Sequence, residues 1–379
     1  MPGRPLGQPT VYLHIGIAKT GTTYLQELLW HNRKVLERHG VRYPAQLPGD
    51  HFRAAVDLRQ TPFAGDHATF VPGTWDTVAA AAMAAPDRAV ISHETLTRTR
   101  VEQVRRAAES FAGADLHLIV TVRDLGRQLP AVWQEQVKNR SAISYARFLR
   151  AVAETPKSRR HKHFWMAQDV LDVLARWSTA VPPERIHVVT VPQPGAESGL
   201  LWQRFASVIG LDPSVVETDV PMSNVSLGVA EAELLRRMNR SLRHRMDWPT
   251  YEREVKVGLA KRLAARRDST RLTVPKNRRA WVEQCAEGMI AGLRSGGYDV
   301  VGNLDELRPV FDERPVVMPS DIRPQQLLQM AGDVVGELVV DNAARRSAGL
   351  PGRLAALNPA TRLGRWVRRY GRRRQRGRG

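Results

Sequence analysis

The first clear pattern along the chain is an alternation of apolar and polar positions close to its start. Val11, Leu13 and Ile15 are separated by single residues, a period of two that predicts a short buried strand. Leucines then follow at helical spacing, which predicts a helix that ends near Gly40. The chain therefore opens with a strand, a short glycine-containing loop and a helix.

The same alternation of strands and helices continues to about residue 210. Further strands are predicted at 41–43, 88–92, 116–122 and 185–191. Helices are predicted at 52–59, 77–85, 101–112, 128–139, 145–153, 164–178 and 200–209. This order predicts an α/β fold with a mostly parallel sheet and helices on both of its faces.

Beyond residue 219 the pattern is helical, with helices predicted at 228–242, 251–266 and 277–294. We therefore expect one domain over residues 1–340. Its sheet core spans about 10–215 and its helical C-terminal portion about 220–340. An arginine-rich tail, 341–379, follows it.

Composition narrows the class of protein. The chain has 379 residues and is 42% hydrophobic, which is typical of a globular protein with a large core. Cys285 is the single cysteine, so intrachain disulfides and cysteine zinc clusters are excluded. The first ten residues contain three prolines and no apolar core, unlike a signal peptide, and no apolar run approaches ~20 residues. A cytoplasmic protein is expected.

The positive charge is concentrated at the C-terminal end. Of a formal net charge of +19, residues 342–379 contribute twelve arginines and no acid. Leu363, Trp366, Val367 and Tyr370 are spaced i, i+3, i+4 and i+7 among these arginines, which predicts a basic amphipathic helix. Such a helix suits an anionic membrane surface, and a solvated disordered tail is the alternative. The remaining charge suits an anionic cofactor and requires no nucleic acid.

The loop after the first strand carries the strongest chemical signal. A strand that breaks at Gly16 and restarts as a helix after Gly21 leaves free backbone N–H groups at the helix N-terminus, which together can cradle a phosphate. Lys19 adds a positive charge, and Thr22 and Thr23 add hydroxyl donors. The alternative is a glycine turn that binds nothing.

The spacing of this loop distinguishes between phosphate chemistries. Triphosphate-binding loops read G-x-x-x-x-G-K-[ST], with glycine directly before lysine. Here the order is Lys19-Thr20-Gly21-Thr22-Thr23, with lysine two places before glycine. This order resembles the 5′-phosphosulfate loop of sulfotransferases that use 3′-phosphoadenosine 5′-phosphosulfate (PAPS).

A second element, Arg123-Asp124 after the strand 116–122, fits the same resemblance. In the sulfotransferase pattern this arginine and a serine eight residues later hold the 3′-phosphate of the cofactor, and the fork of an arginine suits a phosphate. Here the eighth position is Ala131, so one hydroxyl donor is missing and a backbone N–H or Arg127 would have to assist. The alternative role for Arg123 is a structural ion pair.

Four shorter stretches extend the resemblance to a group of bacterial sulfotransferase-family proteins, over roughly residues 10–310. They are His14-Ile-Gly, Ser92-His-Glu, Trp133-Gln-Glu and Asn224-Val-Ser-Leu-Gly. The resemblance implies a P-loop NTPase-like sulfotransferase fold that requires no metal ion. It also implies a site in which residues 18–23 (Ala18, Lys19, Thr20, Gly21, Thr22 and Thr23) hold the 5′-phosphosulfate, and Lys19 stabilises the leaving group.

The acceptor must lose a proton as it attacks, so a base is required. His93 and Glu94, directly after the strand 88–92, are the candidates; the alternative is that Glu94 caps the following segment and His93 is solvated. His14 is a second choice, although a buried core histidine is equally consistent with its place in a strand. His51 is a weaker acceptor-site candidate. The basic cluster at 159–163 could bind an anionic acceptor, but a solvated loop is the simpler interpretation.

Together these patterns predict a PAPS-dependent sulfotransferase that acts on a hydroxyl or amine of a small-molecule, carbohydrate or lipid acceptor. The acceptor pocket is expected from residues 44–75 and from the region after 220. Two alternatives are a Mg²⁺-dependent P-loop phosphotransferase and a non-catalytic protein that binds polyanions or membranes. The expected location is the cytoplasm, with peripheral membrane contact through the tail.

Overall fold

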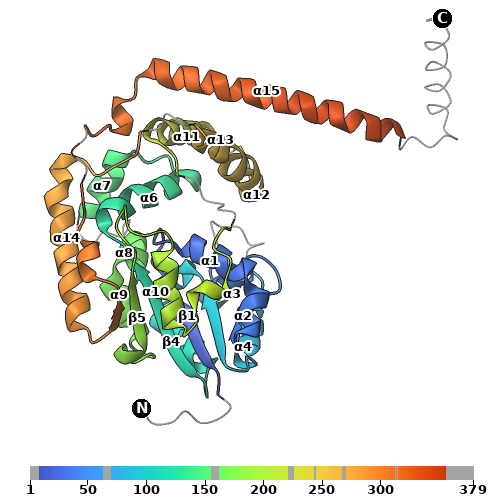
Figure 1. Ribbon diagram of the computed structural model, residues 1–379. Coiled ribbons are helices and arrows are strands. Elements are labelled where there is room, and N and C mark those ends of the chain that lie inside the picture. Colours follow the sequence, from blue (N-terminus) through green and yellow to red (C-terminus); the bar gives the residue numbers. More distant parts are fainter. Residues whose placement is uncertain are drawn as a thin grey trace, which may run out of the picture. The chain divides into compact units, whose positions relative to one another are not determined.

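A computed structural model gives the fold of the chain (Figure 1). The residues it describes are 8–62, 70–154, 162–220, 226–242, 245–266, 270–311, 313 and 315–355. The chain divides into two compact units, Met1–Ile322 and Arg323–Gly379. The sheet and all the site residues discussed below belong to the first unit.

Six parallel strands form one sheet in the order β2-β3-β1-β4-β5-β6. Their bounds are Thr10–His14 (β1), Val41–Arg42 (β2), Arg88–Ser92 (β3), Asp115–Val122 (β4), Ile186–Thr190 (β5) and Asp299–Val301 (β6). The predicted parallel sheet is confirmed. The three-residue strand β6 was not predicted, because it is too short to show a period.

Alternate residues of each strand pack on opposite faces of the sheet. In β1, Val11 and Leu13 contact one hydrophobic cluster, while Tyr12 contacts the other. The first cluster is covered by α3 (Asp50–Arg59), α4 (Thr74–Met83), α5 (Val101–Glu109), α9 (Val170–Trp177) and α14 (Lys276–Ser295). The second is covered by α1 (Thr22–His31), α2 (Arg33–Arg38) and α10 (Leu200–Val208). The sheet is therefore covered by helices on both faces, as predicted.

The other helices of the first unit lie beyond the carboxyl ends of the strands (Figure 1). They are α6 (Leu125–Lys138), α7 (Tyr145–Ala153), α8 (Lys162–Gln168), α11 (Val229–Leu242), α12 (Trp248–Tyr251), α13 (Ala260–Ala264) and a π-helix, Glu252–Leu259. Ligands of open parallel sheets bind at this edge.

Three predicted helices are interrupted. The helix predicted at 164–178 is two helices, because the Asp169 carboxylate accepts hydrogen bonds from the N–H groups of Leu171 (3.1 Å) and Asp172 (3.3 Å) and starts α9. The helix predicted at 251–266 contains the π-helical segment, and the first helix of the chain is divided at Asn32 into α1 and α2.

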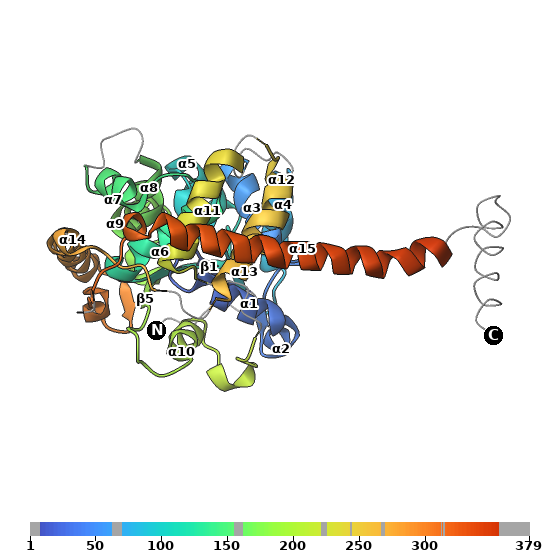
Figure 2. The same cartoon turned by 90° about the horizontal axis from the view of Figure 1, so that it is seen from above.

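In the second unit, Pro324–Ala355 forms a single helix, α15 (Figure 2). It begins in the portion expected to be helical, about 220–340, but no helix with these bounds was predicted. It passes through residues 340 and 341, so the expected start of the tail does not coincide with the end of an element. The amphipathic helix predicted at 359–370 lies outside the described residues. No helix in the described part of the chain combines the length and apolar character needed to cross a bilayer.

Candidate functional site

The loop between β1 and α1 is fixed by hydrogen bonds to β4. The N–H groups of Ile15 and Ile17 donate to the carbonyls of Ile119 (3.0 Å) and Thr121 (3.1 Å). The buried Thr20 hydroxyl donates to the Ile17 carbonyl at 2.5 Å and lies 2.6 Å from the Thr121 hydroxyl. Thr20 therefore secures the turn with its side chain, and only its backbone remains for a ligand.

The turn itself requires left-handed backbone conformations. Lys19 has a φ of 74° and Gly21 a φ of 86°, and Gly21 is the N-cap of α1. A Cβ atom on Gly21 would lie 2.5 Å from Leu201 Cδ2, so a larger residue would have to displace the Leu201 side chain as well as adopt a strained backbone conformation. The first turn of α1, including Thr22 and Thr23, lines a cavity, so the positive end of the helix dipole is directed to it.

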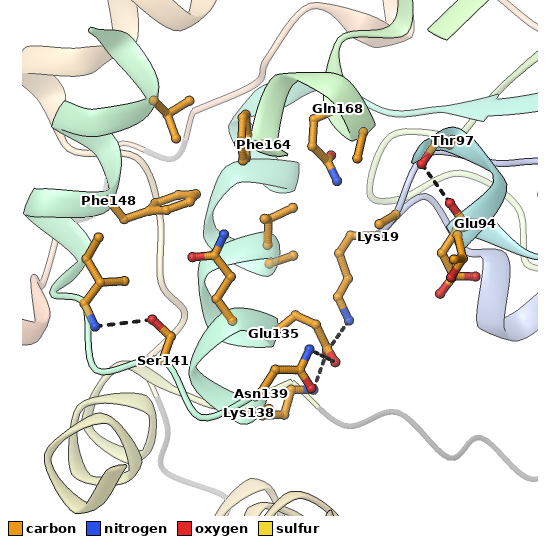
Figure 3. A pocket seen from close by; sticks show the side chains of 18 of the residues that line it. Lys19, Glu94, Thr97, Glu135, Lys138, Asn139, Ser141, Phe148, Phe164 and Gln168 are labelled. Carbon is orange, nitrogen blue, oxygen red and sulfur yellow. Dashed lines mark hydrogen bonds and ion pairs between the residues drawn. The ribbon is translucent and has the colours of Figure 1, made fainter. Parts of the chain in front are cut away.

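The cavity has a volume of about 1780 Å³, larger than the roughly 300–1,000 Å³ that holds one drug-sized ligand. It is lined by the loop, by the segment after β3 and by α6, α7 and α8 (Figure 3). The expected acceptor regions contribute Phe52, Ser226, Arg240, Trp248, Glu252 and Lys256. The wall formed by α6, α7 and α8 was not predicted, since its residues show only an amphipathic helical pattern.

Lys19 is paired with a residue that no motif singled out as part of the site. Its Nζ lies 2.6 Å from Oε2 of Glu135 on α6 (Figure 3). Lys138 and Lys256 lie 3.3 Å and 3.7 Å from the same carboxylate. Glu135 belongs to the Trp133-Gln-Glu stretch, but its pairing with Lys19 could not be read from the sequence.

Arg123 lines the same cavity at the end of β4. Its Nη1 donates to the Lys19 carbonyl at 3.1 Å, and its buried Nε has no hydrogen-bond partner among the described residues. Burial, together with the charge of Arg127, lowers the pKa of Arg123 to about 10, so the guanidinium is charged at neutral pH. A charged guanidinium that lines the cavity and keeps one buried donor without a partner fits an anionic ligand.

Arg127, which was expected to assist Arg123, is bound to Asp124 instead. Asp124 is buried, caps α6 by accepting the Arg127 N–H at 2.9 Å, and forms an ion pair with the Arg127 side chain. Arg127 also donates to the Pro192 carbonyl at 2.9 Å. Arg127 is thus not available to replace the missing serine, although Ala131 itself lines the cavity.

His93 and Glu94 both line the cavity, but in different chemical states. The Nδ1 of His93 accepts the Thr95 N–H at 3.1 Å, so the neutral ring carries its proton on Nε2; burial lowers the pKa of His93. Burial alone would raise the pKa of Glu94, but His93, hydrogen bonds that include one from Gln26 and the Lys19 charge together lower it. Glu94 is therefore the ionised carboxylate of the pair.

His14 and His51 are buried outside the cavity. His14 lies within hydrogen-bond distance of Ser92 (2.7 Å) and Thr121 (3.3 Å), and burial lowers its pKa to about 3. His51 accepts the Ser92 N–H at 3.2 Å, and burial lowers its pKa to about 4. Both are neutral core histidines that do not line this cavity.

Some predicted residues lie outside the part of the chain that is described. This holds for Asn224 and Val225 and for residues 159–161 of the basic cluster, and for the side chains of residues 162 and 163. Within the described part, no group of three His, Cys, Asp or Glu side chains is arranged to hold a metal ion.

Comparison with known proteins gives one match. No protein-family model matches the chain, and no curated protein matches it significantly. A solved structure of a sulfotransferase from Alicyclobacillus acidocaldarius matches with a TM-score of 0.38 and 14% identity, over 66% of this chain and 99% of that chain. Because these values are low, we base the functional proposal on the residues of the site.

Proposed function

We propose that this protein is a sulfotransferase that moves a sulfuryl group from PAPS to a hydroxyl or amine of an acceptor. The observation that carries the proposal is the loop Lys19-Thr20-Gly21-Thr22-Thr23 at the carboxyl end of the central strand, with Arg123 beside it. The lysine–glycine order of this loop resembles that of phosphosulfate loops. A cavity larger than one drug-sized ligand requires is consistent with a donor and an acceptor bound together.

The loop residues 18–23 and Arg123 would hold the donor at its two ends. The N-terminus of α1 and Lys19 suit the 5′-phosphosulfate, with backbone N–H groups and the positive end of the helix dipole directed at the anion. Arg123, with its unpaired Nε, suits the 3′-phosphate. The Thr20 hydroxyl would take no part, because it is bonded to the Ile17 carbonyl and lies 2.6 Å from the Thr121 hydroxyl of β4.

Transfer forms a bond between the acceptor oxygen or nitrogen and sulfur, and breaks the bond between sulfur and the bridging phosphate oxygen. The electron pair of the broken bond stays on that oxygen, where Lys19 stabilises the charge that develops. The acceptor proton passes to Glu94, which is ionised and lines the cavity. His93 serves as a hydrogen-bond donor through Nε2, since its Nδ1 lone pair is occupied.

The Mg²⁺-dependent phosphotransferase alternative depends on Asp124, the acidic residue that follows β4. Asp124 is buried, caps α6 and pairs with Arg127, which favours a structural role over metal binding. The acceptor that we propose is a small molecule, a carbohydrate or a lipid.

Cytoplasmic location and membrane contact through residues 359–370 remain predictions from the sequence.

The test is label transfer from ³⁵S-PAPS to a panel of alcohols, phenols, amines, oligosaccharides and glycolipids. We expect labelled product with at least one class, inhibition by 3′-phosphoadenosine 5′-phosphate (PAP), and loss of transfer in Lys19→Met. Parallel reactions with γ-³²P-ATP and Mg²⁺ test the alternative. Transfer of ³²P, or a folded protein with no saturable site for PAP, would contradict the proposal.

A further inference from the structure

Glu135 gathers lysines from three separate parts of the fold. Its Oε2 lies 2.6 Å from Lys19 Nζ and 3.3 Å from Lys138 Nζ (Figure 3). Its Oε1 lies 3.7 Å from Lys256 Nζ. The lysines belong to the loop after β1, to α6 and to the π-helix Glu252–Leu259. π-Helices are rare and are frequently found at functional sites, and here the π-helix supplies residues of the cavity.

The cluster is sheltered from solvent. The exposed fractions of the side chains are 25% for Glu135, 22% for Lys19 and 11% for Lys138. Burial by itself would raise the pKa of the Glu135 carboxyl, but the three neighbouring ammonium groups hold it well below its usual range. Glu135 is thus an anion at neutral pH whose oxygens already lie against three lysine ammonium groups, which points to a function through the cations that it binds.

The Lys19 ammonium cannot interact at full strength with the donor and with the Glu135 carboxylate at the same time. The proposed chemistry needs the Lys19 ammonium at the bridging oxygen of the donor, whereas the structure has it on the Glu135 carboxylate. We propose that Glu135 is a positioning residue that competes with the donor for Lys19: it holds the ammonium before the donor binds and takes it back as PAP leaves. This inference rests on the proposed function.

The surrounding residues make this exchange feasible. When Lys19 moves to the donor, Lys138 and Lys256 remain on Glu135, and Asn139 donates to it at 3.4 Å. The carboxylate is therefore not left buried without a cation, an arrangement that would be strongly destabilising. Because only the fraction of protein with Lys19 released binds tightly, the competition weakens PAP binding and speeds product release.

The experiment compares PAP binding in the wild type and in Glu135→Gln, which keeps the shape of the side chain and removes its charge. We expect PAP to bind roughly tenfold more tightly to the variant and to dissociate correspondingly more slowly. The reason is that the partly buried Lys19–Glu135 ion pair, which competes with PAP for Lys19, is removed. In turnover, the KM for the donor should fall, and kcat should fall with it if product release limits the rate. A residue with a merely structural role would weaken PAP binding when changed.

The matched control is Glu252→Gln. Glu252 is a carboxylate of the same cavity whose ion-pair partner, at 3.9 Å, is Lys256. We expect its change to alter PAP affinity less than twofold, because it does not hold Lys19. Thermal unfolding of each variant checks that the fold is retained. If Glu135→Gln does not fold, Glu135→Asp replaces it in the experiment. The aspartate side chain is one methylene shorter, which moves the carboxylate away from Lys19, so PAP binding should also tighten.

A double-mutant cycle with Lys19→Met separates competition for Lys19 from plain repulsion between Glu135 and the donor. If Glu135 acts by holding Lys19, Glu135→Gln should no longer tighten PAP binding in the Lys19→Met background. Persistence of the full effect in that background, or no tightening in the first place, would overturn the inference.

Titration with pyrophosphate keeps this inference distinguishable from the proposed function. Pyrophosphate can occupy the loop without needing a 3′-phosphate site. If Glu135→Gln tightens pyrophosphate binding while the wild type does not bind PAP, the role of Glu135 stands and the proposed function fails. If PAP binds and drives turnover but Glu135→Gln has no effect, the proposed function stands and the role of Glu135 is refuted.

Discussion

At the scale of single residues, Arg123 combines a charge, burial and an unsatisfied donor. Its Nη1 is bonded to the Lys19 carbonyl, while its buried Nε has no partner in the described part of the chain. A buried charged donor without an acceptor destabilises the fold unless a ligand accepts its hydrogen bond. This arrangement leads to a prediction about the 3′-phosphate of the cofactor.

PAP should bind more tightly than 5′-AMP by on the order of 1.5–3 kcal/mol, because only PAP offers the 3′-phosphate to the guanidinium. In Arg123→Gln the two nucleotides should bind with similar affinity, and 5′-AMP should be little affected. Isothermal titration calorimetry of both ligands on both proteins measures this. Equal affinities in the wild type would show that Arg123 is structural.

A substitution at Ala131 should do the opposite and raise the affinity for PAP. It lines the cavity at the position where the sulfotransferase pattern has serine, and Arg127 is committed to Asp124. Ala131→Ser should strengthen PAP binding by about 1 kcal/mol, the contribution of one recovered hydrogen bond. Affinity should rise for PAP but not for 5′-AMP. A parallel rise for both nucleotides would place this residue away from the 3′-phosphate.

Glu94 and His93 differ in their ability to accept a proton. The His93 Nδ1 lone pair is occupied by the Thr95 N–H, whereas Glu94 is ionised. With the proton acceptor removed, Glu94→Gln should lower kcat by roughly 10²–10⁴-fold, and His93→Gln should lower it much less. Steady-state rates with a weakly acidic alcohol acceptor test the difference. The reverse order of effects would make His93 the base.

At the scale of elements, the entry into α1 depends on one glycine. Gly21 is the N-cap of α1 with a φ of 86°, and Gly199 is the N-cap of α10 with a φ of 84°. A Cβ on Gly21 would meet Leu201 at 2.5 Å, whereas one on Gly199 would meet nothing within 4 Å. Alanine variants at the two positions therefore distinguish the cost of backbone strain, which both share, from the cost of side-chain overlap, which only Gly21→Ala adds.

Gly199→Ala should lower the free energy of unfolding by roughly 1–2 kcal/mol, the cost of a left-handed conformation for an L-residue. Gly21→Ala should cost more than this, because overlap with Leu201 is added, and it should also weaken PAP binding by displacing the loop. Urea unfolding and PAP titration measure both effects. Equal losses of stability would mean that Leu201 moves aside freely.

At the scale of the whole molecule, buried neutral histidines should make stability depend on pH. Burial lowers the pKa of His14 to about 3 and that of His51 to about 4. In the unfolded chain both titrate near the ordinary value of about 6.5. Below that value the two histidines are protonated in the unfolded state but stay neutral in the folded state. The free energy of unfolding is therefore retained above pH ~6.5 and falls as the pH is lowered toward 4.

At pH 5 each of these two histidines should reduce the free energy of unfolding by about 2 kcal/mol relative to pH 7. Urea unfolding at several pH values tests this. In His51→Gln the overall stability will fall, but its slope against pH between 7 and 5 should be smaller than in the wild type. An unchanged slope would show that His51 does not contribute to the pH dependence.

The sequence by itself determined the fold and the place of the loop. Strands β1, β3, β4 and β5 carry local apolar patterns, and a parallel sheet follows from their alternation with helices. The lysine–glycine loop could be recognised because its residue types and their order lie within a few consecutive positions of the sequence. The assignment of Lys19, Arg123 and the surrounding loop residues to a donor site stays a prediction.

Only the tertiary structure decided the state of the side chains. The Lys19–Glu135 pair joins residues 116 positions apart, and no local pattern reports such a contact. The burial of His14 likewise depends on strands brought together from distant parts of the chain. Secondary structure follows from periodicity over a few residues, whereas ionisation and pairing follow from long-range packing, which sets the local dielectric and the nearest charges.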